Sequence, residues 1–147
     1  MHRRIGRFTI ALLTLIAVLT PLAASAAEIM VYKSPYCGCC GGWVAHMRSN
    51  GHSVKTIDLE DLSTIKKMTG VGEELQSCHT AVVDGYAIEG HVPAQDVARL
   101  LAERPKAKGL AVPGMPIGSP GMEGPDPQPY DVLLFQADGS TTVFARR

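Results

Sequence analysis

Aromatic residues, excess charge and long apolar runs are all scarce in this sequence. Only 5% of the 147 residues are aromatic, there is a single tryptophan, and 14 basic residues balance 14 acidic ones. No basic patch indicates nucleic-acid binding. After residue 26 no stretch approaches the ~20 apolar residues of a membrane helix. The composition predicts one ordinary domain, long enough to bury a core.

The first 26 residues have the pattern of a secretory signal peptide. MHRRIGR carries three arginines, FTIALLTLIAVLT is an apolar run of thirteen, and Ala24-Ser25-Ala26 is a small-residue cleavage site. The alternative, an uncleaved anchor, is disfavoured because the run is short. Cleavage would leave 27–147 as a single domain outside the cytoplasm, with no stable membrane span. It removes three of the 14 basic residues and no acidic one, which leaves a net charge of −3.

Cysteine is also scarce, and its distribution is uneven. Three of the four cysteines, Cys37, Cys39 and Cys40, lie within PYCGCCGGW, and the fourth is Cys78. A structural disulfide stabilises most when it closes a long loop, and only a bond to Cys78 would do so. The spacing therefore favours a chemical role for the cluster over a purely structural one, although exported proteins can keep disulfides.

Hydrophobic patterning predicts an α/β fold with the order β-α-β-α-β-β-α. Asn50-Gly51 and Gly70 are predicted to end the first two helices, Asp61 or Ser63 to begin the second, and Asp84-Gly85 to form a hairpin turn. This order is typical of a thioredoxin-like fold, with two parallel strands joined by a helix. The predicted strands are 28–33, 53–59, 80–83 and 86–90, and the predicted helices are 42–49, 61–68 and 93–104.

The last forty or so residues divide into a loop and a hairpin. Residues 109–129 are rich in Gly and Pro, so we expect an irregular loop that wraps the surface and contains Met115 and Met122. Residues 130–147 contain two strand-like runs around Asp138-Gly139 and predict a C-terminal β-hairpin that extends the sheet or packs on its edge.

Cys37 and Cys40 form a C-x-x-C between a strand and a helix. A helix N-terminus favours the thiolate, which is both the redox nucleophile and the ligand of soft metals. Cys39 favours the metal interpretation, because a third thiol would give a disulfide exchanger wrong partners but gives a metal another ligand. Clustered sulfurs suit Cu(I), with zinc as the second choice.

The segment Ser77-Cys78-His79-Thr80 supplies further candidate ligands. In a thioredoxin-like fold this loop faces the C-x-x-C, and Cys78-His79 replaces the proline expected there. His91, at the end of the fourth predicted strand, is a candidate ligand or orients one. Met115 and Met122 are candidate thioether ligands, although methionine more often fills gaps.

Four other residues are expected to have ordinary roles. His46 and His52 are expected to face solvent, and Trp43 to pack the first helix on the sheet. Glu89 is expected to be a solvated strand residue, with the orientation of His91 as its alternative role.

Three motifs together resemble one known family. They are YKSPYCGCCGGW, SCHTAVVDGYAIEGHVPAQDVARLLAERP and GLAVPGMPIGSPGME, within residues 31–124. They are similar to those of the CopG-like periplasmic copper-resistance proteins, a metal-binding family long described as of unknown function. The resemblance implies a thioredoxin-like fold, copper binding through the C-x-C-C cysteines, and a cysteine-bridged cluster of several coppers. The family's ligand motifs fall on Cys37, Cys39, Cys40, Cys78, His79 and His91.

The sequence therefore predicts a periplasmic copper-binding protein, more a metal-binding protein than an enzyme. Its partners would be copper ions and other periplasmic copper-handling proteins. Two alternatives stay open: an exported thiol-disulfide oxidoreductase that uses Cys37 and Cys40, and a copper oxidoreductase that interconverts Cu(I) and Cu(II). Spacing alone does not give the number of coppers.

Overall fold

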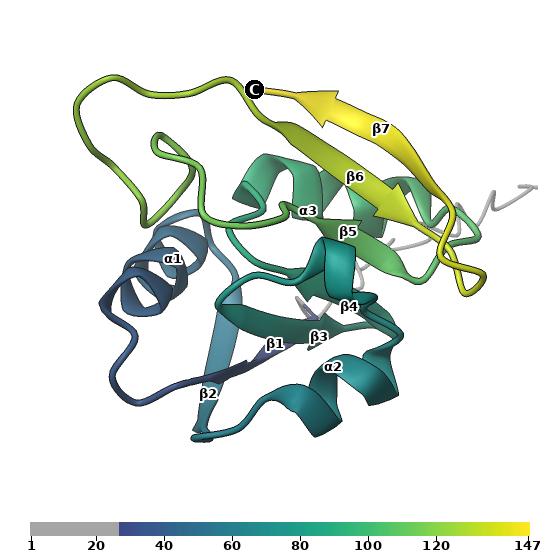
Figure 1. The fold of residues 1–147 in the computed structure, drawn as a ribbon, viewed down its shortest axis with the longest axis horizontal. Helices are drawn as coiled ribbons and strands as arrows, with labels where there is room; N and C mark the ends of the chain where they lie inside the picture. The colour runs from purple at the N-terminus through teal and green to yellow at the C-terminus, as the bar shows by residue number, and fades with distance from the viewer. Residues whose placement is uncertain (1–26) are drawn as a thin grey trace, which may run out of the picture.

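Residues 27–147, as described by a computed structural model, form a mixed α/β fold on a seven-stranded sheet (Figure 1). The predicted signal peptide lies outside the described residues. The strand order is β2-β1-β3-β4-β5-β6-β7. The strands are β1 (Glu28–Lys33), β2 (Ser53–Asp58), β3 (His79–Val83), β4 (Tyr86–Glu89), β5 (Gly109–Ala111), β6 (Asp131–Phe135) and β7 (Thr141–Arg146). The helices are α1 (Gly38–Ser49), α2 (Ser63–Thr69) and α3 (Ala94–Glu103), with a 3₁₀ turn η1 (Glu73–Leu75).

The predicted local turns are found where the sequence places them. β1 and β2 are parallel and are joined through α1, whereas β3 and β4 form an antiparallel hairpin. Asp84 and Gly85 have φ of +48° and +83°, as a two-residue hairpin turn requires. Gly51 and Gly70, which follow α1 and α2, also have positive φ, which relieves the strain of reversing the chain there.

The start of α1 differs from the prediction. The helix begins at Gly38 rather than Gly42, and Cys37 is its N-cap residue. The Sγ atom of Cys37 accepts a hydrogen bond from the backbone N–H of Cys40 at 3.3 Å, which satisfies one of the free donors of the first turn. Cysteine stands at this position instead of an ordinary cap residue such as Ser or Asp. The cysteine motif therefore forms the first helical turn instead of a loop before it.

The start of α2 also differs. Its N-cap residue is Leu62, which makes no side-chain capping bond. The Asp61 carboxylate instead accepts the backbone N–H of Ser63, the first residue of α2, at 2.8 Å.

The Gly/Pro-rich segment is not entirely irregular. Its first residues form β5, which pairs with β4 in parallel and with β6 antiparallel. A Cβ at Gly109 would lie 1.8 Å from the carbonyl oxygen of Ala87, so only glycine allows this pairing. The C-terminal hairpin of β6 and β7 is confirmed, and β5 connects it to the sheet. The hydrophobic pattern did not predict β5, because the strand is short, lies in a Gly/Pro-rich segment and pairs with strands far away in sequence.

The two faces of the sheet bury different clusters. The main core joins α1 and α3 to one face, and its buried members include Trp43, Met47, Val97, Leu100 and Ile88. A smaller cluster on the alternate strand positions contains Val71, Leu75, Ala87, Ala111 and Phe135. Because side chains alternate along a strand, Ile88 and its neighbour Ala87 face opposite layers.

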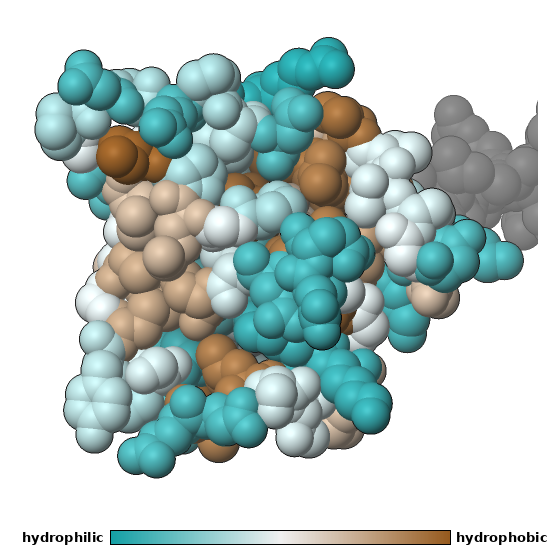
Figure 2. All heavy atoms as spheres, viewed as in Figure 1, coloured by the Kyte–Doolittle hydropathy of each residue, from teal (hydrophilic) through white to brown (hydrophobic). Residues whose placement is uncertain are grey.

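The smaller cluster lies beside α2 and η1. Figure 2 shows hydrophilic atoms gathered over the η1 segment, where Glu73 and Glu74 are exposed. None of the helices between residues 27 and 147 has the length and apolar character needed to cross a bilayer.

Candidate metal centre

The four cysteine sulfurs meet at the N-terminus of α1. Cys37 and Cys40 are joined by a disulfide, whereas Cys39 and Cys78 are free thiols. The Sγ atom of Cys39 lies 3.4 Å from that of Cys37 and 3.8 Å from that of Cys78, and the Sγ atoms of Cys40 and Cys78 are 3.4 Å apart. All four sulfurs lie within 4.8 Å of one another. Two-electron reduction of the disulfide would thus present four thiols in one place.

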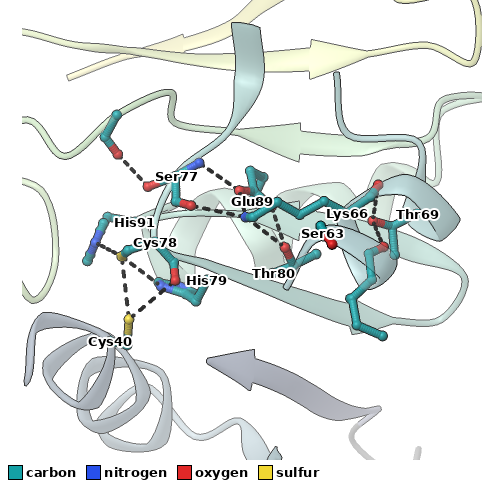
Figure 3. A network of polar contacts seen from close by, with 12 residues as sticks. Cys40, Ser63, Lys66, Thr69, Ser77, Cys78, His79, Thr80, Glu89 and His91 are labelled. Carbon is teal, nitrogen blue, oxygen red and sulfur yellow. Dashed lines mark hydrogen bonds and ion pairs between the residues drawn. The ribbon is translucent and has the colours of Figure 1, made fainter. Parts of the chain in front are cut away.

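Cys78 comes from the opposite side of the site. It precedes β3, and the antiparallel pairing of β1 with β3, which sets Lys33 opposite His79, brings the end of β1 and the start of α1 close to it. Figure 3 shows Cys78 pointing toward Cys40 and flanked by His79 and His91. The predicted proximity of Cys78 to the C-x-C-C motif is therefore present in the structure.

His91 is held in one tautomer by its surroundings. Its Nδ1 atom lies 2.8 Å from the carbonyl oxygen of Pro120. A carbonyl can only accept, so Nδ1 carries the proton and Nε2 keeps its lone pair. Nε2 lies 2.9 Å from Cys78 Sγ. A backbone carbonyl on one nitrogen and a free lone pair on the other is the arrangement common to metal-ligating histidines.

His79 is buried beside the sulfurs and is incompletely satisfied. Its Nδ1 lies 3.4 Å from Cys78 Sγ, and its Nε2 is buried without a hydrogen-bond partner. The His79 ring packs 4.6 Å from the Trp43 ring and 5.1 Å from the His91 ring, measured between centroids. Trp43 packs α1 on the sheet as predicted, and its Nε1 donates to the carbonyl of Val92 at 2.8 Å.

Burial is the main cause of the pKa shifts of His79, His91 and Cys78. It lowers the pKa of His79 to about 3, with His91 and Lys66 adding to the shift. Burial also lowers the pKa of His91, although its bond to Pro120 opposes the shift. Burial, followed by the proximity of Cys39, raises the pKa of Cys78 to about 12. At neutral pH the imidazoles are neutral, which is their ligand form, while Cys78 keeps a proton that a bound cation would displace.

The donor set fits a soft metal ion. Four sulfurs and two neutral imidazoles form two overlapping groups, Cys37-Cys39-Cys40-Cys78 and Cys78-His79-His91, which share Cys78. Thiolate and imidazole are the ligands that suit Cu(I) and zinc, whereas hard cations prefer oxygen. The unpartnered Nε2 of His79 is a buried polar atom that a metal would satisfy.

The Gly/Pro-rich segment covers the site through its backbone. A Cβ at Gly42 would lie 2.9 Å from Gly121 Cα, and a Cβ at Gly121 would lie 2.5 Å from the Cys39 carbonyl oxygen. The segment thus packs directly on the first turns of α1, next to the Pro120 carbonyl that holds His91. Met122 is partly buried in this segment and Met115 is 52% exposed. A thioether role for either methionine stays a prediction.

Two predictions about other residues were wrong. Glu89 is not solvated: it is fully buried and forms an ion pair with Lys66, which is 7% exposed. His46 is partly buried rather than free in solvent, because its Nε2 accepts the backbone N–H of Ala94 at 3.1 Å, at the start of α3. His52 is partly exposed. Lys66 of α2 covers the face of β4 on which Glu89 lies.

The Lys66–Glu89 pair belongs to a network that patterning did not detect. Burial raises the pKa of Glu89 and the Lys66 ammonium opposes the shift. Every neighbour of the carboxylate donates to it, so we assign the ionised form. Figure 3 shows the pair beside Ser77 and Thr80, which flank Cys78 and His79. A lone lysine within Ile65-Lys66-Lys67-Met68 carries no sequence signal of burial.

The chain is similar to known proteins of one family. Residues 75–122 match the family described as "Protein of unknown function, DUF411". The chain is similar to two solved structures of a copper resistance protein, CopG, in forms 1 and 2. Both are 42% identical to this chain with a TM-score of 0.79, and the match covers 84% of this chain and 98–99% of theirs. No match was found among the curated proteins.

Proposed function

Because this chain belongs to the family of copper resistance protein CopG, we propose that it binds Cu(I) through its clustered cysteine thiolates, in copper resistance or homeostasis. The observation that supports this most directly is the meeting of four sulfurs within 4.8 Å beside two buried histidines. Copper is the cargo in this proposal, and zinc is a weaker candidate for the same donors. The ligands we propose are Cys37, Cys39, Cys40, Cys78, His79 and His91, with Met115 and Met122 as additional thioether candidates.

The number of donors exceeds the need of one copper. Cu(I) is satisfied by two or three soft ligands, and a thiolate can bridge two metals. Cys78 belongs to both donor groups, so it is the natural bridge between a sulfur-rich position and a position beside the histidines. We therefore propose that reduced protein holds more than one Cu(I).

The surrounding architecture fits this role. We propose that β1 through α3 form a thioredoxin-like unit and that 27–147 act as a single metal-binding domain. We also propose a periplasmic location after removal of residues 1–26, where copper ions and other copper-handling proteins would be its partners.

Copper redox cycling is a natural extension of this site. In a balanced step, the thiolates of Cys37 and Cys40 would lose two electrons and form their disulfide, while two Cu(II) ions gain one electron each and become Cu(I). The disulfide between these two residues shows that the required S–S bond is sterically accessible. An external thiol reductant would then restore the dithiol.

The same disulfide favours a second candidate, a thiol-disulfide oxidoreductase. A C-x-x-C at a helix N-terminus has the position of such a redox pair. The free thiol of Cys39 lies only 3.4 Å from Cys37, and Cys78 lies 3.4 Å from Cys40, so mixed disulfides with a substrate would have two internal competitors. We therefore favour the copper function.

A competition titration tests the proposal. The purified protein is reduced under anaerobic conditions and titrated with Cu(I) against a chelator of known affinity. We expect retention of more than one copper per chain, and lower capacity when the Cys37–Cys40 disulfide is left intact. If the chelator removes all copper from the reduced protein, the copper proposal fails and disulfide reductase activity becomes the next assay.

A further inference from the structure

One carboxylate fixes both ends of the segment that carries Cys78 and His79. Oε1 of Glu89 accepts the backbone N–H of Ser77 at 2.7 Å, and Oε2 accepts the hydroxyl of Thr80 at 2.6 Å. Ser77 immediately precedes Cys78, and Thr80 immediately follows His79. Glu89 itself ends β4, two residues before His91. A single side chain therefore connects all the sheet-side donors of the metal centre.

Lys66 completes this arrangement from α2. Its ammonium donates to Glu89, to the carbonyl of Ser77 at 3.0 Å and to the hydroxyl of Thr80 at 3.2 Å. An ammonium has three donors, so the burial of this charge is fully compensated. A buried ion pair contributes little net stability compared with apolar residues of similar size. Stability alone is therefore a weak reason for placing this pair here.

The neighbouring backbone leaves little freedom for a different arrangement. Gly90 has a φ of +72°, and a Cβ there would lie 2.5 Å from the Ser77 side chain. The Ser77 hydroxyl donates to the carbonyl of Gly114, and the backbone N–H of Val112 donates to the carbonyl of Glu89 at 3.0 Å. The network thus links residues 77–80 to the turn before His91 and to the segment that covers the site.

The ion pair and the metal centre lie on opposite faces of the sheet. His79 contacts the Trp43 ring on the α1 face, whereas its neighbour Thr80 contacts Lys66 beside α2. This follows from the alternation of side chains along β3. Glu89 therefore does not touch a bound metal and can affect it only through the backbone it holds.

We propose that Glu89, neutralised by Lys66, is a positioning residue that holds Cys78 and His79 in their metal-binding arrangement before the metal arrives. The metal then does not have to order this segment, which preserves affinity. The affinity part of this inference rests on the proposed copper function, whereas the ordering of Cys78 can be measured without copper.

Two double variants separate the positioning bonds from the charge pair. Lys66→Met with Glu89→Gln removes both charges, but the Gln amide can still accept from Ser77 and donate to Thr80. Lys66→Met with Glu89→Leu also removes both charges, and it removes the bonds to Ser77 and Thr80 as well. Asp96→Asn is the control, because Asp96 is 1% exposed and paired with Arg147, and its bonds lead to no proposed ligand.

The first measurement is the reactivity of Cys78 in metal-free protein. In a Cys39→Ser background with the Cys37–Cys40 disulfide intact, Cys78 is the sole free thiol of residues 27–147. We expect iodoacetamide to modify it about tenfold faster in the Leu variant, because the segment opens more often once these bonds are lost. The rates in the Gln variant and in Asp96→Asn should stay near that of the parent, even where the melting temperature falls.

The second measurement is Cu(I) affinity of the same substitutions with all four cysteines present and reduced. We expect a loss of about 10- to 100-fold for the Leu variant and recovery of most of it in the Gln variant. If the parent binds no copper but the alkylation pattern holds, the copper function fails and the positioning role remains. Equal alkylation rates and equal affinities in the Leu and Gln variants would overturn the positioning role.

A single substitution covers the case in which the Leu variant does not fold. Thr80→Val keeps the side-chain shape and both charges but removes the hydroxyl between Lys66 and Glu89. We expect about threefold faster alkylation of Cys78, because one lost bond opens the segment less than losing the whole network. Unchanged alkylation in Thr80→Val would then count against the proposal.

Discussion

The two halves of the candidate metal centre are delivered by the chain in different ways. The helix half consists of Cys37, Cys39 and Cys40, neighbours in the first turn of α1. The sheet half consists of Cys78, His79 and His91, which lie at the start of β3 and just beyond β4. His79, His91 and Cys40 are fully buried, whereas Cys37, Cys39 and Cys78 are partly exposed.

The positions of the donors in the two halves therefore depend on the rest of the fold to different degrees. Sulfurs within one helical turn stay close together whatever happens to the rest of the chain, and two of them have paired as a disulfide. The sheet half exists only when β3, β4 and α2 are assembled, so its positions depend on the whole fold. We infer that the helix half exchanges electrons and ligands, and that the sheet half determines where the metal lies.

Removing the shared sulfur should have the largest effect. Cys78 lies within 3.8 Å of Cys39, 3.4 Å of Cys40 and 2.9 Å of His91, so Cys78→Ser removes a donor from both groups. Since even supporting residues around a metal cost 10- to 100-fold, we expect a loss of Cu(I) affinity above ~100-fold. Cys39→Ser should cost less and lower the number of coppers bound. Competition titration measures both, and equal losses would contradict the unequal roles of the two halves.

The buried state of His79 should make the sheet half sensitive to acid. Its pKa is lowered to about 3 in the folded protein from 6.5 when unfolded. A lowered folded pKa means that stability is complete above pH 6.5 and is lost as the pH falls toward 3. We expect metal-free protein to lose on the order of 5 kcal/mol over this range through His79. Denaturant unfolding of His79→Gln should show a flatter pH dependence, and an unchanged slope would argue against this assignment.

Copper affinity should rise with pH because of the thiols rather than the histidines. The pKa of Cys78 is raised to about 12, so a metal must displace its proton at neutral pH. The pKa values of His79 and His91 are both lowered, so His79 is already neutral at pH 5. We expect affinity to increase about tenfold per pH unit for each thiol proton released. Titrations between pH 5 and 8 measure this slope, and a flat profile would indicate that Cys78 is not a ligand.

A pair of adjacent glycines tests the covering segment with a matched control. A Cβ at Gly42 would clash with Gly121 at 2.9 Å, whereas a Cβ at Gly41 meets nothing within 4 Å. Gly42→Ala should cost about 1–3 kcal/mol through overpacking and should expose the helix half. Gly41→Ala should instead stabilise α1 by up to ~1 kcal/mol. Thermal unfolding and alkylation of Cys39 distinguish them, and similar behaviour of both variants would contradict the close packing.

The sequence was informative where signals are local. Asp84-Gly85 predicted the hairpin and Gly70 the end of α2, whereas the observed start of α1 at Gly38 precedes the predicted start at Gly42. The expectation that Cys78 approaches the other cysteines agrees with the distances, while the ligand roles of all six candidates remain predictions. That expectation rested on the thioredoxin-like pattern, in which the loop before the third strand faces the C-x-x-C. In the structure the antiparallel pairing of β1 with β3 sets the end of β1 beside His79.

The sequence failed where a distant element decides the environment. Glu89 looked solvated because nothing near it in sequence shows that α2 covers its face of the sheet. His46 looked exposed because its partner, the backbone N–H of Ala94, lies 48 residues away. The sequence pattern did not predict β5, because glycine has a low strand propensity. Gly109 is needed there because any side chain would collide with the backbone of Ala87.

X-ray absorption spectroscopy of Cu(I)-loaded protein tests the central claim most directly. If four thiolates share several coppers beside the histidines, the copper shell will be dominated by sulfur and will show short copper–copper distances. Those distances should vanish in Cys78→Ser. A shell dominated by nitrogen or oxygen, or an unaltered spectrum in Cys78→Ser, would contradict the account.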